Sequence, residues 1–156
     1  MRHGQAEFNA PSDKLRNLTQ QGIEESIVMA KWLLTQQTDF SITFVSPYNR
    51  AQQTYNHAIE QIGMVGHHYC LNDLSPESSP KMCGDALLAY CAHHNASSAL
   101  VVSHLPLVAL LVGDLCKGDM MPSFSTSSIA CVDIDLDTWQ GSLLWHRTFN
   151  DVFNGA

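Results

Sequence analysis

The stretch Ala99-Leu100-Val101-Val102-Ser103-His104 decides the fold. Its first four residues form an unbroken apolar run, which is typical of a strand buried on both faces of a parallel sheet. The run ends at His104, and apolar residues then recur at helical spacing over 107–115. The sequence therefore predicts a strand over 99–103 and a helix directly after it.

The segment before this unit alternates in the same way. A short β-branched and aromatic run over 41–45 stops at Ser46-Pro47 and predicts a buried strand. A helix over 50–62, ended by Gly63, should follow it. A further helix should precede it, with Thr19 as N-cap and a buried face made of Ile23, Ile27, Ala30 and Leu34.

The remaining segments complete an α/β pattern. We expect a weak strand at 69–71, a loop over 72–81 and a helix over 85–94. Two late strands, 129–134 and 143–148, flank a turn-like segment and should pair antiparallel. Strands that alternate with helices predict an α/β fold with a mainly parallel sheet.

Composition limits the classes of function. The chain has 156 residues, 45% of them hydrophobic, which predicts one domain over 1–156. With 15 acidic and 8 basic residues the formal net charge is −7, which argues against nucleic acid and membranes as partners. The longest apolar stretch, 105–112, is too short to span a bilayer, so we expect a cytoplasmic protein, and a monomer.

Cysteine and histidine give no sign of a metal. The five cysteines are scattered and never spaced as Cys-x-x-Cys, which indicates reduced thiols. The doublets His67-His68 and His93-His94 point apart on a helix or a strand, so we expect no metal site.

Three predicted strand ends carry unusual side chains, and ligands gather at the carboxyl ends of parallel strands. The segments are Arg2-His3-Gly4, Ser46-Pro47-Tyr48-Asn49-Arg50 and Ser103-His104-Leu105-Pro106. Two of the four arginines lie in them, and the planar arginine fork matches phosphate oxygens.

The chemistry of these segments favours phosphoryl transfer. An unprotonated ring nitrogen of His3 could act as nucleophile, and a protonated His104 could stabilise charge on the transferring group. Gly4, without a Cβ, would let a phosphate approach the backbone closely. Taken alone, such segments are more often an ordinary turn or a structural histidine. Their occurrence at three strand ends favours the phosphate site.

The motifs together resemble the histidine phosphatase superfamily. They are Arg2-His3-Gly4, Leu15-Arg16-Asn17-Leu18-Thr19-x-x-Gly22, Ser46-Pro47-Tyr48-Asn49-Arg50-Ala51-x-x-Thr54 and Val102-Ser103-His104-Leu105-Pro106. Within the superfamily, the short length and the segments 103–108 and 124–130 are most similar to the SixA-type phosphohistidine phosphatases. The likeness implies a three-layer sandwich of the phosphoglycerate mutase type.

The resemblance also implies roles for individual residues. His3 would be the phosphorylated nucleophile, Arg2, Arg50 and His104 would line the phosphate pocket, and Arg16 would reach in from the first loop. No metal or organic cofactor would be needed. The implied substrate is the phosphohistidine of a histidine-containing phosphotransfer domain in a signalling relay.

Two points stay open at this stage. The candidate general acids are Glu77 and Asp85, which are equally compatible with solvated charges. The alternatives are therefore a general small-molecule phosphomonoesterase of the same superfamily, or a phosphate-binding or partner-binding module without turnover. In the superfamily an apolar strand precedes Arg-His-Gly, whereas only Met1 precedes Arg2 here, so we expect the first strand to be truncated.

Overall fold

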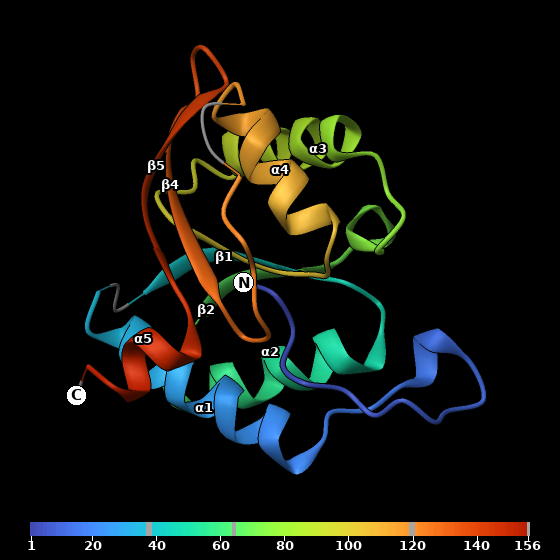
Figure 1. Ribbon diagram of the computed structural model, residues 1–156. Helices are drawn as coiled ribbons and strands as arrows, with labels where there is room; N and C mark the ends of the chain where they lie inside the picture. Colours follow the sequence, from blue (N-terminus) through green and yellow to red (C-terminus); the bar gives the residue numbers. More distant parts are fainter. Residues whose placement is uncertain (37–38, 64, 119–120, 156) are drawn as a thin grey trace.

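A parallel sheet of three strands organises the protein (Figure 1). The structure is a computed structural model that describes residues 1–36, 39–63, 65–118 and 121–155. Strand β1 (Phe40–Val45) lies between β2 (Val65–Cys70) and β3 (Ala99–Val102), and both neighbours run parallel to it. The parallel sheet is confirmed, and β2 is longer than the weak strand predicted at 69–71.

The late strands pair antiparallel, as predicted. Strand β4 (Ile129–Asp135) is joined to β5 (Gln140–Arg147) by a tight turn. Strand β5 begins three residues earlier than expected, because Gln140 pairs with Asp135 and Gly141 with Ile134 directly after the turn. Figure 1 shows this hairpin rising along one side of the molecule.

Helices cover both faces of the parallel sheet (Figure 1). Helices α1 (Gln20–Leu34), α2 (Asn49–Ile62) and α5 (Phe149–Phe153) lie on one side, and α3 (Pro80–His93) and α4 (Leu107–Leu115) on the other. Neighbouring residues of β1 face opposite cores: Val45 packs with α1 and α2, whereas Phe44 packs with α3 and α4. The helix–sheet–helix layers confirm the predicted fold class.

Helix α1 begins as predicted but buries a different face. The Thr19 side chain accepts a hydrogen bond from the Gly22 amide and so caps the helix. The fully buried positions are Gly22, Glu25, Ser26, Met29, Ala30 and Leu33. Of the four residues predicted to be buried, only Ala30 is, because α1 is packed by α2 and α5 and by the segment around Gly4. Helix α3 also starts earlier than predicted, with Ser79 as N-cap.

Residues 1–3 connect the two sheets. The Met1 amino group donates to the Val101 carbonyl at 2.7 Å, and the His3 amide donates to the Ser103 carbonyl at 2.9 Å. On the opposite side the Ser127 amide donates to the His3 carbonyl at 3.1 Å. The backbone of His3 is therefore held between the end of β3 and the segment that leads into β4.

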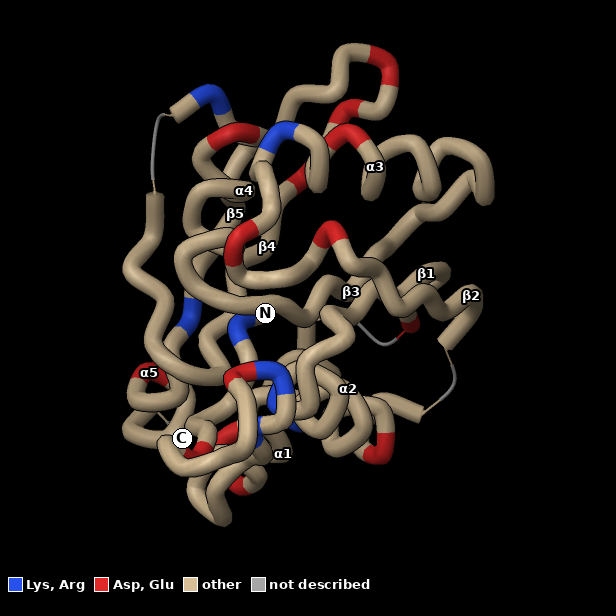
Figure 2. The backbone as a smooth tube through the Cα atoms, turned by 90° about the vertical axis from the view of Figure 1, so that its right-hand side faces the viewer, with Lys and Arg blue, Asp and Glu red and all other residues tan. Residues whose placement is uncertain are grey.

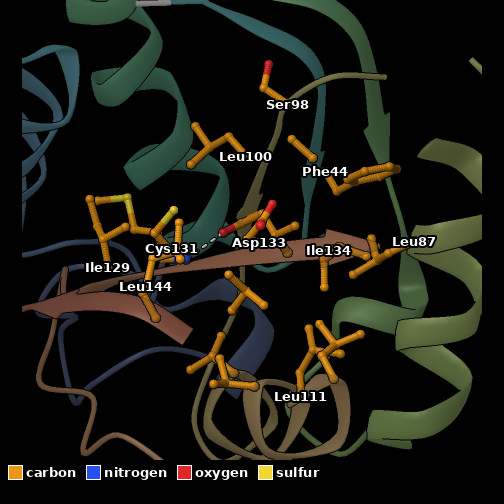
Figure 3. Close-up of a pocket in the computed structure, with 18 of the residues that line it drawn as sticks. Phe44, Leu87, Ser98, Leu100, Leu111, Ile129, Cys131, Asp133, Ile134 and Leu144 are labelled. Atoms are coloured by element: carbon orange, nitrogen blue, oxygen red, sulfur yellow. Dashed lines mark hydrogen bonds between the residues drawn. The ribbon is translucent and has the colours of Figure 1, made fainter. Parts of the chain in front are cut away.

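A cavity of about 530 Å³ lies between β3 and β4 (Figure 3). Its lining includes the consecutive residues 97–101 and 129–134. The side chains of a strand alternate between its two faces, so a cavity against one face would contact every second residue. Contact with consecutive residues therefore means that the edges of these strands border the cavity. Leu87 of α3 and Leu111 of α4 close it on the helical side. The truncation of a strand before Arg2 stays a prediction.

Within the ranges described, no helix is both long and apolar enough to cross a membrane.

Candidate active site

The three predicted strand-end segments meet in one place. Arg50 Nε donates to His3 Nε2 at 3.2 Å, and the ring centroids of His3 and His104 are 5.0 Å apart. A hydrogen bond of 2.7 Å joins His104 Nε2 to Ser46 Oγ. The site therefore lies where residues 1–3, β1 and β3 end. Figure 2 shows basic positions of the chain beside the amino terminus.

His3 is a buried, neutral histidine whose unprotonated Nε2 lies beside Arg50. The residue is 8% exposed, and its Nδ1 is 2.7 Å from the Gly4 carbonyl oxygen. A carbonyl only accepts, so Nδ1 carries the proton and Nε2 is unprotonated. Burial lowers the pKa of His3 to about 4, and the positive charges of Arg50 and Arg2 act in the same direction. Near neutral pH the lone pair on Nε2 accepts from Arg50 Nε, and it can attack an electrophile once that N–H turns away.

His104 is neutral as well, and its protonated role during phosphoryl transfer stays a prediction. The residue is 1% exposed, and burial lowers its pKa to about 2, helped by His3 and Arg50. Its Nδ1 is buried and has no hydrogen-bond partner among the described residues. The ring of Tyr48 packs edge-on against His104, with centroids 4.9 Å apart. Burial among positive neighbours therefore outweighs the tendency of a histidine to take a second proton.

The Arg50 guanidinium is fixed on all sides. The residue is 4% exposed, and its Cζ lies 4.9 Å from the centre of the Tyr48 ring. Besides the bond to His3, Nη1 donates to the Asp13 carbonyl oxygen at 2.6 Å and Nη2 donates to Asp13 Oδ2 at 3.0 Å. Helix α2 positions this side chain, because Arg50 is the second residue of its first turn.

Arg2 brings a second guanidinium near His3. Its Nη1 donates to the Phe124 carbonyl at 2.8 Å, and its Nε is buried with no hydrogen-bond partner in the described part of the chain. Burial lowers the pKa of Arg2, and the positive charge of Arg50 acts in the same direction. Two guanidinium groups and two imidazoles therefore converge, as the resemblance implied.

Arg16 reaches the site only through another residue. Its Nη1 donates to Asp13 Oδ1 at 3.1 Å, its Nε donates to the Glu7 carbonyl, and its guanidinium lies over the Phe8 ring. Direct contact between Arg16 and a phosphate stays a prediction.

Gly4 is required for packing. A Cβ at this position would overlap the carbonyl oxygen of Gly22 in α1. The backbone of Gly4 thus packs too closely against this helix to leave room for a side chain. The Gly4 amide donates to Thr54 Oγ1 at 2.9 Å. A contact between Gly4 and a phosphate likewise stays a prediction.

Neither of the two carboxylates considered as acids contacts His3. Asp85 forms an ion pair with Lys81 at 3.0 Å and borders a separate polar cavity with Asp114 and Trp139. Glu77 is exposed in the turn between η2 (Asn72–Leu74) and α3. Among the described residues, neither carboxylate forms a hydrogen bond or an ion pair with His3.

The carboxylate that does contact the site is Asp13, which sequence reasoning missed. It belongs to the short helix η1 (Asp13–Leu15) in the loop before α1. The only local signal is its spacing of three residues from Arg16, which suits an ion pair. Its contact with Arg50 joins residues 37 positions apart and could not be read from spacing.

Among the parts of the chain with a described position, no group of three or more His, Cys, Asp or Glu side chains could hold a metal ion. The rings of His67 and His94 are tilted against each other with centroids 4.0 Å apart, and a hydrogen bond of 2.7 Å joins His94 Nε2 to the Tyr69 hydroxyl.

Comparisons with known proteins agree with this geometry. The sequence pattern of the Histidine phosphatase superfamily (branch 1) matches residues 1–74. The chain is 41% identical over 158 residues to phosphohistidine phosphatase SixA of Escherichia coli (strain K12), covering 95% of this chain and 91% of that protein. It is 33% identical over 138 residues to the SixA homolog of Haemophilus influenzae, covering 83% of each.

The fold agrees as well. A solved structure of the protein histidine phosphatase SixA complexed with tungstate superimposes with a TM-score of 0.92 at 36% identity, over 97% of this chain and 96% of that one. With a convergent pair of histidines and arginines at its strand ends and relatives of this identity along nearly its whole length, the chain belongs to the histidine phosphatase superfamily.

Proposed function

We propose that this protein is a phosphohistidine phosphatase, which takes the phosphoryl group of a histidine-containing phosphotransfer domain onto His3 and releases it to water. The observation that carries the proposal is the state of His3. Its Nδ1–H is engaged by Gly4, and its unprotonated Nε2 lies beside Arg50 in a buried site. The names of the SixA relatives point to the same activity. The proposed location is the cytoplasm.

The reaction takes two displacements. In the first, the lone pair on His3 Nε2 attacks the phosphorus of a phosphohistidine whose other ring nitrogen carries a proton. The bond between phosphorus and the substrate nitrogen breaks, and the substrate leaves as neutral imidazole. In the second, water attacks the phosphorus of phospho-His3, which releases inorganic phosphate and restores neutral His3. Neither step requires a metal ion in this proposal.

The positive groups around His3 would hold the phosphoryl oxygens. Charge-assisted hydrogen bonds from guanidinium groups are strongest in a desolvated site, which favours Arg50 and Arg2 as donors. A bound dianion would favour a proton on His104, since an opposite charge raises the pKa of a histidine. His104 would therefore take up a proton when the substrate binds.

The carboxylate at the site favours a nitrogen–phosphorus substrate. Partial burial acts to raise the pKa of Asp13, but the hydrogen bonds and charges of Arg50 and Arg16 outweigh it and hold that pKa below its usual value. Asp13 is thus ionised and poorly suited to protonate a leaving group. An imidazole, with a conjugate-acid pKa of about 6.5, leaves without such help, whereas an alkoxide does not.

A covalent label tests the proposal. The protein is mixed with a ³²P-phosphohistidine phosphotransfer domain, quenched in alkali within milliseconds and separated by size. We expect an acid-labile label on the wild type that is absent in His3→Ala and retained in His93→Ala, whose histidine is exposed at the end of α3. Phosphate binding with no label at any mixing time would show a binding module instead.

Substrate preference gives a second test. A phosphohistidine peptide should be turned over efficiently, p-nitrophenyl phosphate more slowly and an alkyl phosphate barely at all. Equal turnover of the alkyl phosphate would require a working acid and would favour a general phosphomonoesterase.

A further inference from the structure

A carboxylate of the protein occupies the arginines assigned to phosphate. Asp13 Oδ2 accepts from Arg50 Nη2 at 3.0 Å, and Asp13 Oδ1 accepts from Arg16 Nη1 at 3.1 Å. One carboxylate thus bridges two guanidinium groups, and one of these also donates to the nucleophilic nitrogen of His3.

The contact uses the donors that a phosphoryl group would need. All three nitrogens of Arg50 already donate: Nε to His3, Nη1 to the Asp13 carbonyl and Nη2 to the Asp13 carboxylate. A guanidinium binds carboxylate and phosphate oxygens with the same planar geometry. A phosphoryl oxygen that takes the same N–H of Arg50 Nη2 must displace Asp13 Oδ2, and one that takes the second N–H of Nη2 meets the negative charge of the carboxylate beside it.

The carboxylate is placed so that it can leave. The Asp13 side chain is 56% exposed, whereas the Arg50 side chain is 4% exposed. The loop keeps two other attachments when the carboxylate turns toward solvent. These are the bond from Arg50 Nη1 to the Asp13 carbonyl and the bond from Arg16 Nε to the Glu7 carbonyl. The exchange needs only a side-chain rotation at the surface.

We propose that Asp13 sets the affinity of the site for phosphorylated substrates and for product phosphate, by competing with the phosphoryl group for Arg50 and Arg16. The inference rests on the proposed function, because it takes these arginines as phosphate-binding. When phosphate leaves, Asp13 returns to the two guanidinium groups and keeps the buried positive charge of Arg50 neutralised. The carboxylate thereby weakens substrate binding and favours product release.

The size of the effect follows from the fraction of time that Asp13 leaves the arginines. The apparent dissociation constant equals the intrinsic constant divided by the binding-competent fraction. If Asp13 holds the arginines for about 70–90% of the time, its removal lowers the dissociation constant about 3–10-fold.

The experiment is calorimetric titration with inorganic phosphate and with tungstate at fixed ionic strength. Asp13→Asn and Asp13→Ala are both expected to bind these anions about 3–10-fold more tightly than the wild type. Asp137→Asn removes the same charge at the exposed turn between β4 and β5, and its affinity should be unchanged. With a phosphohistidine substrate, KM and the inhibition constant of phosphate should fall in the two Asp13 variants, with no rise in kcat.

The possible outcomes separate this inference from the proposed function. The competition is overturned if both Asp13 variants bind the anions as weakly as the wild type or more weakly, while they unfold thermally like the wild type and Arg50→Ala loses binding. Asp13 would then be a support for Arg50. Anion binding that survives in Arg50→Ala contradicts the phosphate pocket itself, and the proposed function with it.

Discussion

Replacement of Arg50 by alanine is the most informative single change in this site. The side chain is buried, donates to His3, the proposed nucleophile, and has two further nitrogens that could bind an anion. Loss of one preorganised donor to a developing oxyanion costs about 2.7–4 kcal/mol, or roughly 100–1,000-fold in rate. Asp13 loses its Arg50 partner in this variant, but phosphate binding gains nothing, because the donor for which the two compete is gone. We expect kcat/KM for a phosphohistidine peptide to fall at least about 100-fold.

A pH profile provides a second measurement on the same variant. Arg50 helps to keep the pKa of His3 low, so its removal should raise that pKa. Activity needs neutral His3, and therefore the acid limb of kcat/KM should move to higher pH in Arg50→Ala. The profile is best recorded with p-nitrophenyl phosphate, because phosphohistidine hydrolyses in acid.

The matched control is Arg147→Ala, since Arg147 is exposed on β5 and its Nη1 donates to the neighbouring carbonyl of His146. Arg50→Lys, which keeps the charge without the planar fork, should fall between the wild type and Arg50→Ala. Kinetics in Arg50→Ala that match Arg147→Ala, with an unshifted acid limb, would refute the assignment of Arg50 to the phosphate.

Three further predictions concern stability. Gly4→Ala should lower the free energy of unfolding by about 1–3 kcal/mol in denaturant titration, because its Cβ would overlap the Gly22 carbonyl. The control Gly84→Ala lies in the interior of α3, where a Cβ makes ordinary contacts, and should be neutral or stabilising. Equal losses in the two variants would contradict this reasoning. The pKa of His3 falls from 6.5 to about 4 on folding, so the unfolded chain binds more protons in this window and stability rises with pH. On acidification from about pH 6.5 to about pH 4, His3 alone should cost about 3 kcal/mol, and the slope should flatten in His3→Gln. An extension of about five apolar residues before Met1 should raise Tm by filling the cavity between β3 and β4, whereas a Gly-Ser extension of equal length should leave it unchanged.

Local sequence was a reliable guide where short-range physics dominates. The apolar run that begins at Ala99 formed β3, Thr19 capped α1, and Gly63 ended α2 with a φ of 87° that glycine adopts without strain. The strand-end rule also placed His3, Arg50 and His104 correctly as neighbours, because parallel strands bring their carboxyl ends to one edge.

Local sequence was a poorer guide where a side chain's environment comes from distant elements. Helix α1 buries Met29 and Leu33 instead of most of the residues predicted. Apolar residues occur on several sides of this helix, and the elements packed against it determine which side is buried. The protonation of His104 likewise depends on burial and on charges contributed by other segments.

The order of the motifs along the chain therefore predicted the family, the layer architecture and the strand-end residues that meet at the candidate site. Only the tertiary structure decided that Gly4 is needed against α1, that His104 is neutral, and that the carboxylate on Arg50 belongs to Asp13. The physical reason is that hydrogen bonding, desolvation and charge pairing depend on distances of a few ångströms in space. Residues far apart in the sequence can lie that close together, and their sequence positions do not show it.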